Sequence, residues 1–157
     1  MSGQLQRELH QTKPFESPAH EMYLNIVRTA FVLQRGGNEP LKAAGISAEQ
    51  YNVLRILRGA GAGGWSCQEI AERMVSFDPD LTRLIDRLLK RGWVVRERSS
   101  TDRRVVISKI TAAGLAVLKQ LEAPMRESLE RLVGHLQQGE MRKLIDLLER
   151  VRVGAPS

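Results

Sequence analysis

The hydrophobic pattern is clearest in residues 79–92, where apolar side chains recur every three or four positions. This spacing places them on one face of a short helix and leaves polar residues on the other faces. The apolar positions are Leu81, Leu84, Ile85 and Leu88, and the polar ones are Thr82, Arg83, Asp86, Arg87 and Lys90. Pro79 fits the first helical turn, which Asp78 or Ser76 could cap. Gly92 is expected to end the helix.

Two β-rich runs, residues 93–98 and 105–110, follow this helix and flank the sequence SSTDRR, which has the composition of a turn. The pattern predicts a hairpin with a charged tip. From position 83 to position 104, eight basic residues face three acidic ones. The basic residues are Arg83, Arg87, Lys90, Arg91, Arg96, Arg98, Arg103 and Arg104, and the acidic ones are Asp86, Glu97 and Asp102. A helix fits the major groove of DNA and a hairpin can reach the backbone or the adjacent minor groove, as in a winged-helix DNA reader.

Two capping-box patterns mark helix starts earlier in the chain. The first, Ser47 to Gln50, opens a helix whose expected buried residues are Tyr51, Val53, Leu54, Ile56 and Leu57. The second, Ser66 to Glu69, opens a helix through Met74 with Ile70 and Ala71 facing inward. This helix, a short link and the helix of residues 79–92 together predict a helix-turn-helix.

The glycine run of residues 59–64 is expected to end the first of these helices and to form a flexible link. A phosphate-binding loop is the alternative, but it requires a preceding strand and a following Gly-Lys-Ser/Thr. The sequence has neither, so we favour the link.

Both ends of the chain hold further amphipathic helices. Residues 19–34 form one, which Gly36 and Gly37 stop, and a preceding polar arm has a helical turn around residues 5–9. Thr111 is expected to cap a long helix with an apolar seam of Leu115, Leu118, Leu121, Met125, Leu129, Leu132 and Leu136. Pro124 should kink or split that helix. Gly139 marks the next break, and residues 140–152 form the last helix.

The composition is that of one domain with a substantial core, since 42% of the 157 residues are hydrophobic. The net charge of +6 favours a polyanion, either nucleic acid or an anionic membrane surface, although a solvated basic surface is the alternative. A single cysteine excludes an intramolecular disulfide, and no apolar run is long enough to span a bilayer. The N-terminal segment lacks the apolar core of a secretory signal. We therefore expect a soluble cytoplasmic protein.

The predicted fold class is mainly α with a small β-hairpin wing, namely a winged helix-turn-helix with N- and C-terminal dimerisation helices. Residues 1–18 are expected to be a flexible arm and residues 19–157 a single domain. Within it, residues 47–111 form the DNA-binding part, and the helices of about 19–36 and 112–152 carry apolar faces that this part cannot cover. They could form an intrachain bundle, but we favour pairing with a second copy, because a twofold dimer presents two reading helices to two half-sites.

The segment from Leu81 to Gly114 resembles the MarR family of bacterial transcriptional regulators. The resemblance includes the Leu88-to-Gly92 close of the reading helix and the Asp102-Arg103-Arg104 wing tip. It continues in the entry to the long helix, where Ile110 stands in place of the usual leucine before Thr111. With the order of the helices on both sides, it covers about residues 19–152. It implies a homodimeric repressor or activator on a palindromic operator, with ligands or oxidants often loosening DNA binding. We expect a repressor relieved by a small-molecule effector, and the resemblance assigns no effector-binding residue.

The candidate contacts follow from charge and position. A hairpin tip can place the guanidinium groups of Arg103 and Arg104 in the minor groove, where negative potential is concentrated. Asp102 would be repelled by phosphate, so we expect it to pair with Arg104 and hold the tip in one shape. The alternative is that these three are ordinary solvated turn residues. On the reading helix, Arg83 is the expected specificity residue, because arginine can make two hydrogen bonds to guanine.

The other expected contacts lie around the reading helix. Asp80 is expected to stabilise the helix N-terminus rather than to read cytosine. Ser66 and Gln68 could hold a phosphate at the start of the preceding helix, although Ser66 is already explained as a cap. The complete set of predicted DNA contacts is Ser66, Gln68, Asp80, Thr82, Arg83, Arg87, Arg98, Asp102, Arg103 and Arg104.

No other chemistry is favoured by the sequence. Cys67 at a helix start could be a redox sensor, but a lone cysteine is more often inert. His10, His20 and His135 are too far apart in the sequence for a metal site, so no metal or cofactor is expected. No nucleophile elbow, HExxH or phosphate loop supports an enzyme. A winged helix that binds protein without reading DNA is the alternative function, against which the arginine-rich wing argues.

Overall fold

The structure is a computed structural model, and it describes residues 3–76 and 80–155. The chain forms two compact units, residues 1–37 and residues 38–157. The expected helix-capping residue Asp78 and the proline at position 79 lie outside the described residues. The domain boundaries predicted from the sequence stay predictions.

The first unit consists of helix α1, Gln4–Glu8, and helix α2, Pro18–Gly37. The helical turn expected in the N-terminal arm is confirmed by α1, whose Leu5 side chain is buried. The carboxylate of Glu8 at the end of α1 lies 3.7 Å from the guanidinium of Arg28 in α2. The Glu8–Arg28 ion pair therefore connects α1 to α2, and the Leu5 side chain of α1 is buried.

Helix α2 confirms the predicted helix of residues 19–34 and continues to Gly37. Its apolar residues Tyr23, Val27 and Phe31 are spaced by four, so they share one face. They are 61%, 49% and 55% exposed, respectively. These three residues therefore form an exposed apolar stripe on α2.

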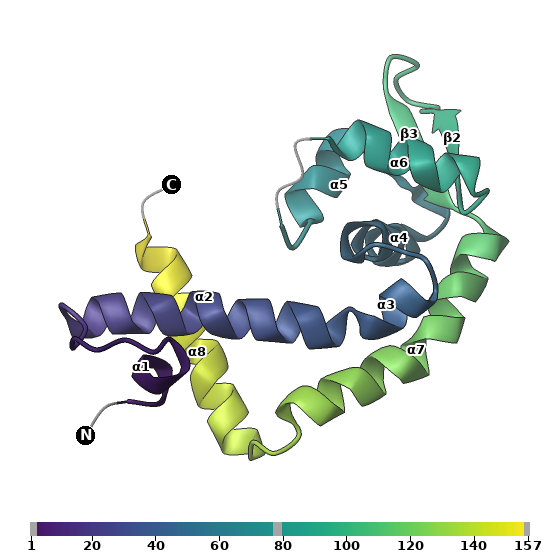
Figure 1. Ribbon diagram of the computed structural model, residues 1–157. Helices are drawn as coiled ribbons and strands as arrows, with labels where there is room; N and C mark the ends of the chain where they lie inside the picture. Colours follow the sequence, from purple (N-terminus) through teal and green to yellow (C-terminus); the bar gives the residue numbers. More distant parts are fainter. Residues whose placement is uncertain (1–2, 77–79, 156–157) are drawn as a thin grey trace. The chain divides into compact units, whose positions relative to one another are not determined.

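The second unit holds the remaining elements, shown in Figure 1. The helices are α3 (Glu39–Ala43), α4 (Ala48–Ala60), α5 (Cys67–Arg73), α6 (Leu81–Lys90), α7 (Ala112–Val133) and α8 (Gln138–Gly154), with the 3-10 helix η1 (Gly61–Gly63) after α4. The strands are β1 (Trp65–Ser66), β2 (Val94–Arg98) and β3 (Val106–Ile110). The predicted winged helix-turn-helix is therefore confirmed, while α3 and β1 were not expected.

The three strands form an antiparallel sheet in the order β1-β3-β2. The predicted hairpin is confirmed, with Val94 opposite Ile110 and Arg98 opposite Val106. The glycine run, expected to be a flexible link, instead forms η1 and leads directly into β1. Gly64 has a φ of +67°, and a Cβ there would overlap the carbonyl oxygen of Ser108. A glycine is therefore needed where β1 meets β3.

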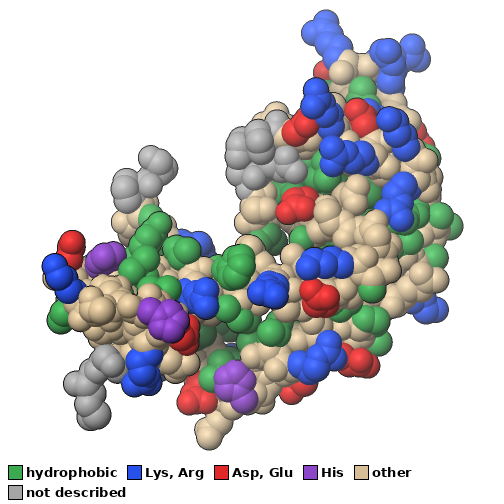
Figure 2. Space-filling model, in the orientation of Figure 1, with side chains coloured by type: hydrophobic (Ala, Val, Ile, Leu, Met, Phe, Trp, Pro, Cys, Tyr) green, Lys and Arg blue, Asp and Glu red, His purple; other side chains and the backbone are tan. Residues whose placement is uncertain are grey.

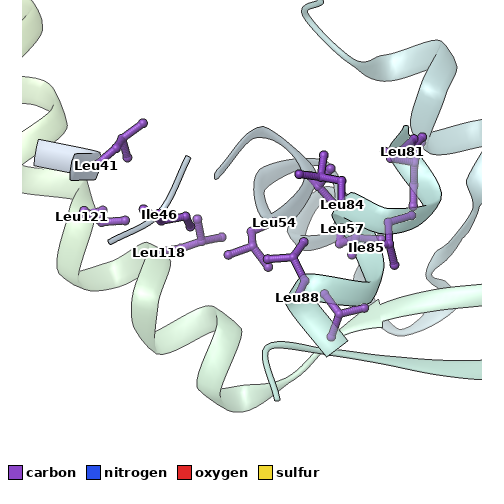
Figure 3. Packing of buried hydrophobic residues seen from close by; sticks show 13 residues of the cluster. Leu41, Ile46, Leu54, Leu57, Leu81, Leu84, Ile85, Leu88, Leu118 and Leu121 are labelled. Atoms are coloured by element: carbon purple, nitrogen blue, oxygen red, sulfur yellow. The ribbon is translucent and has the colours of Figure 1, made fainter. Parts of the chain in front are cut away.

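The hydrophobic core lies where α4, α6 and α7 meet, as Figure 3 shows. All four apolar residues predicted for the face of α6 are buried. They lie in one cluster with the α4 residues Leu54 and Leu57, with Val94 of β2, and with Leu118 and Leu121 of α7. Of the residues expected to be buried in α4, Tyr51 and Ile56 are only half-buried. The core therefore joins the reading helix and the hairpin to the long helix.

Hydrogen bonds at the helix starts confirm three predicted caps. Capping boxes begin α4 at Ser47 and α5 at Ser66, and the Thr111 hydroxyl accepts from the backbone N–H of Gly114 at the start of α7. Two expectations were wrong. Ala71 of α5 is exposed, and Ser76 does not cap α6, because the N-cap position is Asp80.

The last two helices differ from their predicted bounds. Helix α7 is continuous through Pro124, so the expected split was wrong. Leu121 before the proline is buried and Met125 after it packs against the core, and this packing compensates for the backbone hydrogen bond that proline cannot make. The break falls at residues 134–137 rather than at Gly139, which lies inside α8. Leu136 therefore lies outside α7.

We predict that Gly114→Ala destabilises the fold by about 1–3 kcal/mol, as overpacking of a tight site does. A Cβ on Gly114 would overlap the carbonyl oxygen of Trp93 and the side chain of Ile110, so the first turn of α7 would have to move off the hairpin. Equilibrium urea unfolding of the purified chain measures the difference.

Gly139→Ala is the matched control, because a Cβ on Gly139 in α8 meets nothing within 4 Å. This change should be neutral or stabilising by up to about 1 kcal/mol. Equal destabilisation by both variants would contradict the close packing of α7 on the hairpin.

Candidate nucleic-acid interface

Helix α6 separates its residues into a buried face and a charged exposed face. Thr82, Arg83, Arg87 and Lys90 are exposed, and Asp86 is half-exposed. The Arg83 guanidinium lies 3.4 Å from the Asp80 carboxylate, and its side chain is 78% exposed. An ion pair this exposed restrains a side chain only weakly. Arg83 can therefore leave Asp80 for a base or phosphate, and Asp80 lies at the helix N-terminus as expected.

A second cation on α6, Arg87, lies one turn after Arg83. Its side chain is exposed and has no hydrogen bond or ion pair with any residue in the described part of the chain. The guanidinium groups of Arg83 and Arg87 therefore face the solvent, while the opposite face of α6 is buried in the core. This is the arrangement that a major-groove reading helix requires.

The tip of the hairpin is held by hydrogen bonds around Ser99, which is buried. Its backbone N–H donates to the carbonyl oxygen of Val105 at 2.9 Å, and its hydroxyl oxygen accepts from the backbone N–H groups of Thr101 and Asp102. The role of Ser99 was not predicted from the sequence. Serine hydroxyls commonly bond the backbone two or three positions on, so a serine at the start of a turn was the available signal.

Asp102 also shapes the tip, although not through the partner that was expected. Its carboxylate accepts from the backbone N–H of Arg104 at 2.9 Å, and no ion pair joins it to the Arg104 guanidinium. Its carbonyl oxygen accepts from the backbone N–H of Val105 at 2.9 Å. Asp102 therefore holds the tip through the backbone N–H of Arg104 rather than through its guanidinium, and the Arg104 side chain remains exposed.

Three arginines surround this tip. Arg98 donates to the carbonyl oxygen of Arg103 at 3.3 Å and so braces the turn from β2. The guanidinium groups of Arg103 and Arg104 are exposed and have no hydrogen-bond or ion-pair partner within residues 3–76 and 80–155. Figure 2 shows basic side chains gathered over this end of the second unit. No described residue therefore pairs with the guanidinium groups of Arg103 and Arg104.

The start of α5 offers less to a ligand than the sequence suggested. The Ser66 hydroxyl and backbone N–H are both engaged in the capping box with Glu69, at 3.3 and 2.8 Å. Gln68 is exposed and donates to the Glu72 carboxylate at 3.2 Å. Gln68 can therefore exchange its partner for a phosphate at little cost, whereas Ser66 cannot without breaking the cap.

The capping box lowers the pKa of the Glu69 carboxyl. The largest cause is the hydrogen bond from the Ser66 backbone N–H, followed by the hydrogen bond with the Ser66 hydroxyl, and the charge of Arg73 adds to both. Each of these interactions favours the ionised carboxylate.

Comparison with known proteins agrees with this arrangement. The family model described as "MarR family" matches residues 46–106. The multiple antibiotic resistance protein MarR of Escherichia coli is 34% identical over 118 residues, which are 73% of this chain and 78% of that protein. The chain belongs to the MarR family. A MarR transcription factor from Planctomyces limnophilus is 43% identical in sequence, with a TM-score of 0.67 over 87% of this chain and 98% of that one.

The MarR fold extends to a structure solved with DNA. A MarR family transcriptional regulator from Streptomyces coelicolor, in complex with DNA, has a TM-score of 0.81 over 94% of each chain, at 21% identity. That likeness concerns the fold alone. The MarR family consists of transcriptional regulators that bind DNA.

Within residues 3–76 and 80–155, no three side chains among His, Cys, Asp and Glu lie together in a group that could hold a metal ion. The described helices include none with the length and hydropathy needed to cross a membrane. The exposed thiol of Cys67 has the Thr82 hydroxyl 4.0 Å away as a contact.

We predict that Ser66→Ala raises the pKa of Glu69 toward its ordinary value, because the hydroxyl contribution is lost while the backbone bond remains. Because the pKa of Glu69 is lower in the folded than in the unfolded chain, its carboxylate stabilises the fold at a pH above the ordinary pKa. This stabilisation is lost as the pH falls through the lowered pKa. Carbon-detected NMR of the carboxyl groups over an acid titration measures the shift.

Ser47→Ala is the control for this titration, because its capping partner is the uncharged Gln50. It should leave the Glu69 pKa unchanged. An unchanged Glu69 pKa in Ser66→Ala would contradict the capping-box account of α5.

Proposed function

We propose that this chain is a homodimeric, sequence-specific DNA-binding regulator that represses transcription from a palindromic operator and is released by a small-molecule effector. One observation carries the proposal: the arginines of α6 and of the wing tip project, exposed, from one packed unit. Among the described residues, the only ion pair that their side chains form is the solvent-exposed one of Arg83 with Asp80. Such a surface favours a polyanion of fixed shape over a protein partner, whose interface would deplete charge.

The residues divide into base-reading and backbone-binding sets. Arg83, exposed near the start of α6, reads a guanine edge in the major groove, with Thr82 and Arg87 beside it. Arg103 and Arg104 enter the flanking minor groove or contact its phosphates. Gln68 adds a phosphate contact, while Ser66, Asp80, Arg98 and Asp102 shape the elements that carry these side chains. Specificity thus comes from α6 and much of the affinity from the wing.

The dimer follows from apolar faces that the chain leaves uncovered. On α8, Leu144, Ile145 and Val151 are 47%, 54% and 41% exposed, and α2 carries the stripe of Tyr23, Val27 and Phe31. Faces of this kind on two terminal helices are typical of an interface between copies. Twofold pairing would give two reading helices and hence a palindromic site.

The proposal also includes repression of transcription and its relief by an effector. A protein that covers an operator blocks transcription, and a ligand that prefers the unbound conformation releases it. The second unit contains an open cavity of about 380 Å³ between α4 and α7. Its lining carries both signs of charge, with Arg55, Arg126, Glu130 and the ion pair of Arg58 with Glu122. A cavity of this size is sufficient for a small organic effector. Binding to a bacterial chromosome would place the protein in the cytoplasm.

We predict strongly salt-dependent binding to duplex DNA from the promoter next to the gene, because each neutralised phosphate releases counterions. Arg104→Ala should weaken binding to all sequences and reduce the slope of log Kd against log salt by about 1. Arg83→Ala should instead relax preference at one base pair, at a cost of about 1–3 kcal/mol for the preferred base. Fluorescence anisotropy over a salt series, with each base pair varied in turn, separates the two effects.

Arg150→Ala is the matched control, since it removes the same charge from α8, away from α6 and the hairpin. It should change affinity far less than Arg104→Ala. Binding that does not respond to salt, or no binding at low salt, would count against DNA recognition and favour the protein-interaction alternative.

We predict a mass near twice the chain mass of 17.6 kDa by light scattering at micromolar concentration. Ile145→Lys should shift the protein toward monomer, because burying an unpaired ammonium at an interface is costly. Val153→Lys, at a position 88% exposed near the end of α8, is the control and should remain dimeric. A wild-type monomer would overturn the dimer.

A further inference from the structure

Helix α6 and the wing are close-packed at only one of their two ends. At the end near the helix C-terminus, Leu88 and Val94 are buried together and the Trp93 backbone N–H donates to the Leu88 carbonyl oxygen at 3.1 Å. Toward the helix N-terminus an open cavity of about 300 Å³ separates α6 from the sheet. Its lining includes Ile85 on α6 and Ser108 on β3. Side-chain packing alone therefore does not fix the hairpin against this part of α6.

One ion pair joins α6 to the hairpin through Arg96, which also lines this cavity. The Arg96 guanidinium on β2 lies 2.6 Å from the Asp86 carboxylate on α6 and donates a hydrogen bond to it. The two side chains are 32% and 44% exposed, respectively. In the described part of the chain, the ion pair of Arg83 stays beside α6 and that of Glu97 with Lys109 stays within the hairpin. Among the described ion pairs of these elements, only Asp86 with Arg96 joins the reading helix to the wing.

A carboxylate at this place needs an explanation if the surface binds DNA. Asp86 lies among the cations of α6 and the wing, where a negative charge lowers the positive potential and repels phosphate. Removing it should strengthen DNA binding if long-range electrostatics were its only effect. An exposed ion pair also contributes little to folding stability, so stability does not account for it.

We propose that Asp86 is a positioning residue that, through Arg96, sets the distance between α6 and the wing, so that both can contact one duplex at the same time. The inference rests on the proposed DNA binding. Two contact sets on one rigid body bind with a high effective concentration, because the second contact forms without a further search. When the connection is loosened, the Arg103 and Arg104 tip contributes less to affinity although its own residues are unchanged.

The test measures operator affinity for the wild type, Asp86→Ala, Arg104→Ala and the double variant. We expect Asp86→Ala to weaken binding about tenfold, although it makes the protein more positive. Arg104→Ala should weaken the wild type about tenfold but the Asp86→Ala protein about threefold or less, since the tip is then no longer held in place. If Asp86 positions the wing, the two losses of affinity are therefore not additive in the double variant. If each residue acts independently, the two losses add.

Glu97→Ala is the matched control, because it also removes one carboxylate from this basic region but breaks a pair that lies within the hairpin. It should leave affinity unchanged or raise it slightly. The exchange of charges in Asp86→Arg with Arg96→Asp keeps the net charge and should restore most of the affinity lost by Asp86→Ala. Thermal unfolding of each variant verifies that it is folded.

Tighter binding by Asp86→Ala, or equal effects of Arg104→Ala in both backgrounds, would overturn the positioning role while leaving DNA binding intact. Failure of the wild type itself to bind would overturn the proposed function instead. An exchange variant that folds but binds no better than Asp86→Ala would also count against the ion pair as the connection.

Discussion

The burial of one face of α6 is the constraint on which the rest of the structure depends. Leu81, Leu84, Ile85 and Leu88 enter a core shared with α4, the hairpin and α7, as Figure 3 shows. Each such side chain stabilises the fold by about 1.5–3 kcal/mol when fully buried. Because this face cannot turn outward, the opposite face must carry whatever charge the sequence gives it. The rotation of α6 about its axis is thereby fixed, and its cationic side chains are held facing the solvent.

Burial of the apolar face of α6 also makes it possible to place many positive charges close together on α6 and the wing, although their mutual repulsion destabilises the fold. Arginines that lack partners repel one another, and that repulsion lowers stability. Here the core tolerates it, and the internal pairs formed by Asp86 and Glu97 offset part of it. Among the described residues, the Arg87, Arg103 and Arg104 guanidinium groups have no ion pair, and that of Arg83 has only the exposed pair with Asp80. A duplex that supplies phosphates to both would remove the repulsion and gain affinity from it.

Local patterns in the sequence predicted what local interactions decide. The buried face of α6 and the capping boxes at Ser47 and Ser66 follow from residues within four positions of one another. Elements that depend on distant partners were missed: strand β1 has two residues and exists through its pairing with β3. Pro124 was expected to kink or split α7, and the split was wrong, because packing on either side of the proline keeps the helix continuous. At the tip, charge and position predicted the exposed arginines, whereas the role of Ser99 depended on how the turn closes.

Hydrogen–deuterium exchange with and without operator DNA tests most directly whether α6 and the wing bind one duplex together. The account predicts that DNA slows exchange at the backbone amides of residues 100–104 and at the first turn of α6, in the same titration and at the same DNA concentration. Exchange in α8 should stay unchanged. Slowing confined to the terminal helices, or slowing of α6 without the tip, would contradict the account.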